Sequence, residues 1–191
     1  MTPVLQLNNV GVARADATVL RGVSLQLDQG QSLAIVGCSG AGKSTLLRAI
    51  ADLLDPAETL AGSVIRADTR PSWQVIGVVF QEPLASLDPL WTIGRLVAEP
   101  LRSLGVPRAQ WHARSVRALE IAGFANAEHI AQLHPHELSG GMRQRVLLAR
   151  VMAGNAPIML MDEPLSNLDP PHQVDWLEQV HGLLAQGTTV V

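Results

Sequence analysis

The sequence has 191 residues, of which 47% are hydrophobic and 16% are charged, a composition that excludes a disordered chain and fits one globular domain with a sizeable core. Its formal net charge of −3 predicts no broad basic surface, so we expect no nucleic-acid partner. Apolar runs are much shorter than the roughly 18 residues that span a bilayer, and no basic region precedes an apolar core at the N-terminus, so we expect a cytosolic chain.

The N-terminal part of the chain predicts two paired strands and a third, buried strand. Residues 4–12 and 19–27 alternate loosely between apolar and polar side chains on either side of a polar turn at 14–17, which predicts a β-hairpin. A second turn at 28–31 leads into the apolar run 32–36, which predicts a buried strand. This strand leads directly into the most informative motif of the chain.

That motif is Gly37-Cys38-Ser39-Gly40-Ala41-Gly42-Lys43-Ser44-Thr45, which fits the pattern G-x-x-x-x-G-K-[ST] of a phosphate-binding loop. Its glycines let successive backbone N–H groups point at a triphosphate, Lys43 neutralises the β and γ phosphates, and Ser44 can ligate Mg²⁺. A helix follows, whose N-terminal dipole also favours phosphate. Its apolar positions recur with a helical period at Leu46, Leu47, Ile50, Leu53 and Leu54. We therefore expect the chain to bind a nucleotide.

The single cysteine, Cys38, lies inside this loop. One cysteine excludes an internal disulfide framework and a multi-cysteine zinc site. The simplest interpretation is a small filler residue. The alternative is a reactive thiol, because the N-terminus of a helix lowers the pKa of a cysteine.

After the loop helix, short strands alternate with helices. Asp55-Pro56 ends that helix, and residues 82–133 show short helical patterns divided by prolines, which predicts an α-helical insertion. Ser139 caps a further helix, and a last helix is expected from about Pro171 to Gln186. Strands are expected at Gly62–Arg66, Val75–Phe80, Ile158–Met161 and Thr188–Val191.

Two acids, Asp162 and Glu163, follow the apolar strand at 158–161. A Mg²⁺-nucleotide site needs such a pair opposite its phosphate loop. Asp162 can hold the metal through water, and Glu163 can orient and polarise the attacking water. The alternative is that both acids only cap the following turn.

A second anion-binding helix start is predicted at Leu138-Ser139-Gly140-Gly141-Met142-Arg143-Gln144-Arg145. A serine and two glycines at the start of a helix form an anion site of their own. One nucleotide has no obvious way to use both helix ends of a single subunit. We therefore interpret the pair as two subunits that face head to tail and complete each other's sites.

The segment Leu138-Ser139-Gly140-Gly141 resembles the signature motif of the ATP-binding-cassette ATPases, and its place between the phosphate loop and Asp162-Glu163 matches the order of that family. The resemblance covers essentially the whole chain and implies ATP and Mg²⁺ as ligands. It also implies an α/β fold, in which a P-loop NTPase (RecA-like) core sheet carries an N-terminal antiparallel β subdomain and an α-helical signature subdomain. We expect one cassette domain over 1–191, incomplete at its C-terminus, with the core at 1–80 and 155–191 and the helical subdomain at 81–154.

Carried over residue by residue, the resemblance implies further roles. Gln81 is expected to link metal and nucleotide to the helical insertion, and the loop 166–169, with Asp169, is expected to contact the partner subunit. Leu138 to Met142, with Ser139 foremost, are expected to act across the interface on the nucleotide of the partner. The partner is a second copy or a related second ATPase.

A narrower resemblance, to the ATPases of oligopeptide, dipeptide and nickel importers, rests on Gln81 to Gly94, His134 to Glu137 and Met142 to Arg145. It implies that membrane permease subunits place short coupling helices on residues Glu82–Pro100, although prolines there can also serve only to shape helix ends. A substrate-binding protein would take part indirectly, and the chain would lie on the cytoplasmic side of the membrane. The sequence does not decide between a peptide and nickel or a metal chelate as the solute.

Two positions depart from the family pattern. An aromatic residue usually stacks on adenine near the end of the first hairpin strand. Alignment places Arg14 there, which either stacks through its planar guanidinium or is a solvated turn residue. The family's switch histidine follows the strand after the last helix, and the sequence ends within that strand at Val191. We therefore expect a truncated family member, in which ATP binding persists while hydrolysis falls by roughly ten- to a thousandfold.

Two other functions stay open at this point. A cassette ATPase that acts on DNA or ribosomes would share these motifs, but relatives of that kind carry zinc cysteines, long coiled coils or a second cassette, which this sequence lacks. A catalytically degenerate nucleotide-binding subunit is favoured by Arg14 and the missing histidine. Glu163 and the intact signature motif disfavour it.

Overall fold

The computed structural model describes residues 3–15, 17–79, 87–165 and 170–191, and these residues group into two compact units. The first unit consists of Met1–Val78, Pro157–Asp162 and Leu184–Val191, and the second of Val79–Ala156 and Glu163–Leu183. The adjacent acids Asp162 and Glu163 fall on either side of a boundary between the units.

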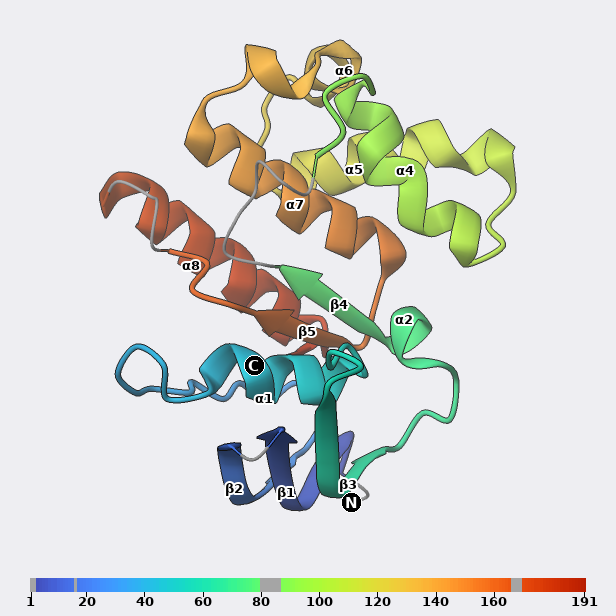
Figure 1. Ribbon diagram of the computed structural model, residues 1–191. Coiled ribbons are helices and arrows are strands. Elements are labelled where there is room, and N and C mark those ends of the chain that lie inside the picture. Colours follow the sequence, from blue (N-terminus) through green and yellow to red (C-terminus); the bar gives the residue numbers. More distant parts are fainter. Residues whose placement is uncertain (1–2, 16, 80–86, 166–169) are drawn as a thin grey trace. The chain divides into compact units, whose positions relative to one another are not determined.

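The first unit begins with an antiparallel sheet in the order β2-β1-β3 (Figure 1). Its strands are β1 (Leu5–Arg14), β2 (Ala17–Leu27) and β3 (Glu58–Arg66). Leu5 pairs with Leu27 on one side and with Arg66 on the other. The alternate apolar residues of β1 are buried, namely Leu5, Leu7, Val10 and Val12. The predicted hairpin is confirmed, and β3 begins four residues earlier than predicted.

A second sheet has the order β4-β5-β6, with strands β4 (Ile76–Val79), β5 (Ile158–Met161) and β6 (Thr189–Val190). Strands β5 and β6 are parallel, and Ile158 pairs with Thr189. The prediction of a strand from Val75 to Phe80 is correct only in part, because Val75 ends the short helix α2 (Ser72–Val75) and Phe80 lies outside the described residues.

The strand predicted at residues 32–36 is wrong for most of its length. Only Ser32 forms a bridge, with Val190, and the N–H of Leu33 donates to the carbonyl oxygen of Val190 at 2.9 Å. Beyond that point the segment has no assigned strand, and the side chain of Val36 is 88% exposed. The pairing of this segment depends on β6, which lies far away in the sequence, and it ends at Leu33.

Helix α1 (Lys43–Ala51) packs into the core of the first unit together with both sheets. Leu46, Leu47 and Ile50 are buried, as their helical spacing predicts. Leu53 lies past the end of the helix and is 49% exposed, which differs from the predicted apolar face. The core includes residues from α1, β1, β5 and the end of the chain, among them Ile50, Leu5, Leu160 and Val191.

The second unit is mostly helical (Figure 1). Its helices are α4 (Ile93–Ser103), η1 (Arg108–Gln110), α5 (Trp111–Ile121), α6 (Ala127–Gln132), η2 (Pro135–Glu137), α7 (Gly140–Gly154) and α8 (Pro170–Ala185). Helix α7 packs against α4 and α5. Its buried residues include Val146, Leu147 and Leu148. The α-helical insertion predicted at residues 82–133 is confirmed by the helices of its described part, from Ile93 to Gln132.

Among the helices of the described ranges, none is both long enough and apolar enough to cross a membrane.

Candidate nucleotide-binding site

The loop before α1 folds around the ammonium group of Lys43. Lys43 Nζ donates hydrogen bonds to the carbonyl oxygens of Gly37 at 3.0 Å and Cys38 at 3.1 Å, and the N–H of Ala41 donates to Cys38 O at 3.2 Å. These bonds curve the backbone around one positive charge. Residues 37–41 are exposed, so an anion can approach the loop and its lysine from solvent.

Helix α1 begins at a residue that cannot cap it with a side chain. Its N-cap Gly42 has φ 91°, and no acidic residue lies in the first turn. A Cβ at Gly42 would lie 2.6 Å from Leu20 Cδ2 and 3.2 Å from the carbonyl oxygen of Val19, so α1 starts directly against β2. Because glycine brings no capping oxygen and the first turn brings no carboxylate, this helix end favours an anionic ligand.

Arg48 ties α1 to β3. Its guanidinium donates to Thr45 Oγ1 at 3.3 Å and to Glu58 Oε1 at 3.1 Å, and the side chain of Glu58 is only 3% exposed. The second oxygen of Glu58 accepts from the N–H of Asp55 at 3.0 Å. Thr45, the last residue of the predicted loop motif, is itself buried. Its hydroxyl therefore supports the helix, and a buried, paired carboxylate holds that helix to the sheet.

Ser44 and Asp162 offer the oxygen atoms that Mg²⁺ prefers. Ser44 is exposed in the first turn of α1, and Asp162 is half-buried directly after β5. Both residues belong to the first unit. A hydroxyl and a carboxylate suit Mg²⁺, which usually completes its shell with water and substrate phosphates. The residues present therefore fit a Mg²⁺-nucleotide.

Glu163 has an unusual backbone. Its φ is 47°, in the left-handed region that side-chain-bearing residues rarely adopt, and its side chain is exposed. Backbone strain of this kind gathers at active sites, where the surrounding structure holds it in place. The catalytic role of Glu163 stays a prediction.

The second predicted anion site, at the start of α7, is built from a capped helix end. Ser139 is the N-cap, and its Oγ accepts a hydrogen bond from the N–H of Met142 at 3.3 Å, as predicted. Leu138 is buried, whereas Ser139 and Gly140 are exposed. A Cβ at Gly140 would meet no atom within 4 Å, and the first turn of α7 holds no acidic residue. Leu138 thus anchors a helix end that presents its backbone to solvent.

Glu137 and His134 shape the turn before that helix end. The N–H of His134 donates to Glu137 Oε2 at 2.6 Å. This hydrogen bond holds the pKa of the Glu137 carboxyl below its usual value. The rings of His134 and His136 stack with centroids 5.7 Å apart. Over the described ranges, no group of three or more His, Cys, Asp and Glu side chains could hold a metal ion.

Two glutamines contact the turn that follows Glu163, and neither contact was predicted from the sequence. Gln144 of α7 donates from Nε2 to the carbonyl oxygen of Pro164 at 3.4 Å, and Gln173 of α8 donates to that of Leu165 at 3.5 Å. Gln144 is 5% exposed, and its Oε1 has no hydrogen-bond partner in the described part of the chain. A polar residue on the same helix face as the buried Leu147 and Leu148 was the signal that could have revealed it.

Several predicted site residues cannot be compared with the structure. Gln81, Asp169 and the loop 166–169 lie outside the described residues, as do residues 82–86 of the predicted docking surface. Arg14 is described: it is exposed at the end of β1, opposite Glu58 in the pairing of β1 with β3. Its contact with adenine stays a prediction.

The phosphate loop on an α/β core, with a second exposed helix end on a helical unit, defines a nucleotide-binding protein of the P-loop class. The model of the family described as "ABC transporter" matches residues 20–166, and the chain belongs to this family. The ABC transporter family and the fold class predicted from the sequence are thereby confirmed.

Three similar proteins illustrate the match. The oligopeptide transport ATP-binding protein OppD of Mycobacterium tuberculosis is 41% identical over 164 residues, which are 82% of this chain and 26% of the relative. The nickel import ATP-binding protein NikE of Pseudomonas putida is 38% identical over 179 residues, 90% of this chain and 65% of the relative. A solved dimeric structure of the ATP-binding cassette MJ0796, in a post-hydrolysis state with ADP and Pi, has a TM-score of 0.80 and 31% identity over 98% of this chain and 86% of that one. The chain thus spans between a quarter and two thirds of the two curated relatives.

Proposed function

We propose that this chain is the ATP-binding and ATP-hydrolysing subunit of an importer. The observation that carries the proposal is that one chain holds two helix ends suited to phosphate, at the starts of α1 and α7, and neither has an acidic residue in its first turn. A head-to-tail dimer uses both ends, because each nucleotide then lies between the phosphate loop of one subunit and the signature helix of the other. The dimeric state named for the MJ0796 cassette supports this arrangement.

Within one subunit, Lys43 binds the phosphates, and Ser44 and Asp162 hold Mg²⁺, together with Gln81. When bound, Mg²⁺ neutralises charge on the phosphates. Glu163 orients the attacking water and accepts its proton, and its exposed side chain on a strained backbone supports that role. From the partner subunit, the signature residues 138–142 and Asp169 complete the site.

The transport role is supported by the names of the relatives. OppD and NikE are named for oligopeptide transport and nickel import, so the solute we propose is a peptide or nickel or a metal chelate. ATP-driven dimerisation would pull on membrane permease subunits docked at residues Glu82–Pro100, on the cytoplasmic side of the membrane. A substrate-binding protein would deliver the solute to these permeases.

Steady-state ATP turnover of the chain and of Glu163→Gln, measured over a range of protein concentrations, tests the proposal. We expect turnover that rises faster than linearly with concentration, because only the dimer has complete sites. Glu163→Gln is expected to bind ATP, to form a stable dimer and to lose turnover. Equal turnover in both proteins would remove Glu163 from the mechanism, and linear dependence down to the lowest concentrations would remove the dimer.

A further inference from the structure

Beside the start of α1, the first unit presents the hairpin end, by which we mean residues 13–15 and 17–19 of β1, β2 and their turn. A Cβ at Gly42 would lie 3.2 Å from the carbonyl oxygen of Val19, so β2 passes the helix end that we assign to phosphates. Ala17 starts β2 and pairs with Arg14 at the end of β1. A strand rises about 3.3 Å per residue, so Ala17 lies about 7 Å beyond Val19. The hairpin end is therefore a surface of this unit that the ribose and base of a nucleotide can reach.

Arg14 projects from the side of the sheet that faces α1. Val12, two residues earlier on β1, is buried in the core that α1 shares, and alternate residues of a strand project from the same face. Arg14 also pairs with Glu58 of β3, whose carboxylate accepts from Arg48 of α1 at 3.1 Å. Directly opposed residues of two strands share a face as well. The exposed side chain of Arg14 thus lies on the α1 side of the sheet.

The guanidinium of Arg14 is not taken up by an acid. Three other arginines of the first unit form ion pairs, namely Arg48 with Glu58, Arg66 with Asp52 and Arg70 with Asp68. Within the described ranges, no carboxylate pairs with Arg14. Both the charge and the flat face of its guanidinium are therefore available to a ligand.

The only aromatic residue in the sequence of the first unit is Trp73, on α2. Helix α2 follows Arg66, which pairs with Leu5 at the opposite end of β1 from Arg14. Strand β1 has ten residues, so its two ends lie about 30 Å apart. Of the described residues of the hairpin end, Arg14 is the only one with a planar side chain.

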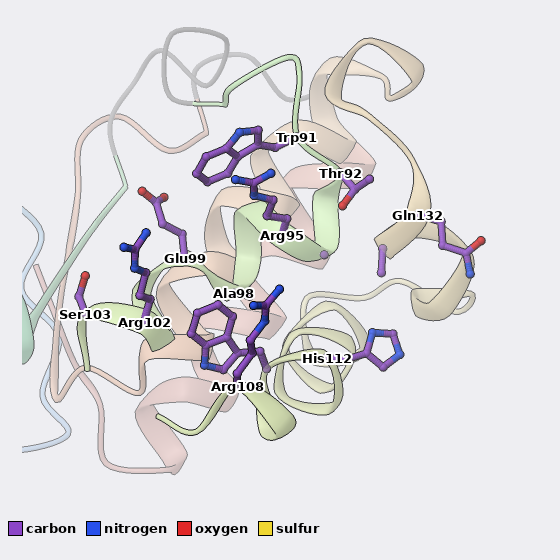
Figure 2. A pocket seen from close by; sticks show the side chains of 13 residues that line it. Trp91, Thr92, Arg95, Ala98, Glu99, Arg102, Ser103, Arg108, His112 and Gln132 are labelled. Carbon is purple, nitrogen blue, oxygen red and sulfur yellow. The ribbon is translucent and has the colours of Figure 1, made fainter. Parts of the chain in front are cut away.

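An arginine that lies flat on an aromatic ring already occurs in this protein. The second unit contains a pocket whose lining includes Arg95, Arg102 and Arg108 (Figure 2). There the guanidinium carbon of Arg95 lies 3.8 Å from the ring centroid of Trp91, and Figure 2 shows the two side chains lying against each other. A purine or pyrimidine ring offers a guanidinium the same kind of face.

A site that reads one particular base needs polar groups that pair with the edge of that base. Such groups penalise the wrong base, because they are then buried without a partner. At the hairpin end, Arg14, Ala17 and Thr18 are exposed. In the described part of the first unit, the only buried side-chain atom without a hydrogen-bond partner is Oδ1 of Asp28, which follows the other end of β2. The described residues of this unit therefore hold no group that would reject a wrong base.

We propose that this site selects the triphosphate and not the base. Lys43 and the start of α1 hold the phosphates, and Arg14 lays its guanidinium against the face of whichever base is bound. Such stacking tolerates any base, because every base has a π-face. The isolated subunit therefore binds ATP, GTP, CTP and UTP with similar affinity. The inference rests on the proposed function in that both concern the same nucleotide site.

Competition of the four Mg²⁺-nucleoside triphosphates with a fluorescent ATP analogue, measured on the full chain at concentrations too low for the dimer, tests the selectivity. We expect the four affinities to lie within about fivefold of one another. Inorganic tripolyphosphate brings the phosphates without a base and should bind at least about fivefold more weakly. An affinity for ATP that exceeds the others by more than this factor, or equal binding of tripolyphosphate, would overturn the proposal.

Substitutions of Arg14 separate stacking from charge. Arg14→Lys keeps the charge and loses the planar group, so it should weaken all four triphosphates by about fivefold or more. Arg14→Trp loses the charge and supplies a ring, so it should bind all four more tightly than Arg14→Lys does. The control is Arg21→Ala, at an exposed residue of β2, which should bind like the unchanged chain. Equal temperatures of thermal unfolding establish that the variants fold. Full affinity in Arg14→Lys would overturn the proposal, because charge alone would then explain the contact.

ATP turnover distinguishes this inference from the proposed function. If all four triphosphates bind alike and none is hydrolysed, the proposed function alone is rejected. If ATP alone binds and is hydrolysed, this inference alone is rejected. Binding of none of the four triphosphates would reject both.

Discussion

The two helix ends that we assign to phosphate, at the starts of α1 and α7, are built in opposite ways. Helix α1 begins at Gly42, which has no capping side chain, and its loop curves around the ammonium group of Lys43. Helix α7 begins at Ser139, whose hydroxyl already accepts from the N–H of Met142, and its first turn carries no acid. The α1 end thus has a cation beside it and no side-chain cap, whereas the α7 end has a side-chain cap.

This difference predicts that the α1 end binds a nucleotide in the isolated subunit, whereas the α7 end contacts one only in the dimer. An uncapped helix end beside a lysine favours an anion in the isolated subunit. A helix end capped by its own serine is stable without a ligand and can stay exposed until a second subunit brings one. The comparison therefore predicts that changes at α1 affect nucleotide binding in the monomer, whereas changes at α7 affect only the assembled dimer.

The largest effect is expected for Lys43→Ala, which removes the cation of the α1 end. ATP should bind about ten- to a hundredfold more weakly, since hydrogen bonds to charged groups contribute about 1.5–3 kcal/mol. Binding is measured with a fluorescent ATP analogue. Arg21→Ala, at an exposed residue of β2, is the control that removes the same charge elsewhere. Lys43 is the only lysine of the chain, so amine labelling of its side chain should be blocked by Mg²⁺-ATP. Unchanged ATP affinity in Lys43→Ala would show that the α1 end does not depend on its cation.

Replacing the glycine at each helix end by alanine should lower the stability of the protein by different amounts. Gly42→Ala places a Cβ at φ 91° and 2.6 Å from Leu20 Cδ2, so it should lower the free energy of unfolding by about 1–3 kcal/mol. Gly140→Ala meets no atom within 4 Å and should change that free energy by less than about 0.5 kcal/mol. Urea unfolding measures both. An equal loss in the two variants would contradict the difference between the ends.

Ser139 provides a pair of variants that separate capping from anion binding. Ser139→Ala should cost about 1 kcal/mol of stability, because the cap is lost. Ser139→Asp keeps a capping oxygen and should keep the stability, but its charge repels a phosphate and should lower ATP turnover of the dimer. ATP affinity of the monomer should stay unchanged in both. If Ser139→Asp turns over ATP at the unchanged rate, the start of α7 is not a phosphate site.

Gln144→Met tests whether α7 also positions the turn after Glu163. Methionine keeps the shape of the side chain and removes one long hydrogen bond, to Pro164 O at 3.4 Å, so the free energy of unfolding should change by less than about 0.5 kcal/mol. We expect kcat to fall by about two- to fivefold with KM unchanged, since only the catalytic turn loses support. Gln132→Met, at an exposed residue of α6, is the control. A parallel change of KM would mean that Gln144 acts on binding instead.

The smallest effect concerns the turn that precedes α7. In this turn, the hydrogen bond from the N–H of His134 lowers the pKa of Glu137. The bond therefore stabilises the folded protein above the usual glutamate pKa, and this stabilisation is lost as pH falls through the lowered pKa. Glu137→Gln should therefore be slightly less stable than the unchanged chain at pH 7, and the difference should shrink at acid pH. Urea unfolding of the two proteins at pH 7 and at acid pH measures this difference. A difference that grows on acidification would contradict this assignment.

Both helix ends were largely predictable because their geometry is local. The lysine, the glycines and the helix that follows occur within a few residues, and Ser139 caps its helix through a bond to a residue three positions on. The prediction of a strand at residues 32–36 was wrong because the pairing of a strand is not local. Its pairing depends on β6, which is far away in the sequence, so an apolar run alone could not reveal how much of it would be paired.

By itself, the sequence determined the phosphate loop, the signature helix with its cap, the pair Asp162-Glu163 and the order in which they follow one another. Those features depend on short-range chemistry, such as φ angles that glycine adopts and caps that serine supplies. Only the tertiary structure decided that Gln144 and Gln173 contact the turn after Glu163, and that Arg95, Arg102 and Arg108 line one pocket. Which side chains converge depends on how helices pack, and packing brings together residues whose separation in the sequence carries no signal.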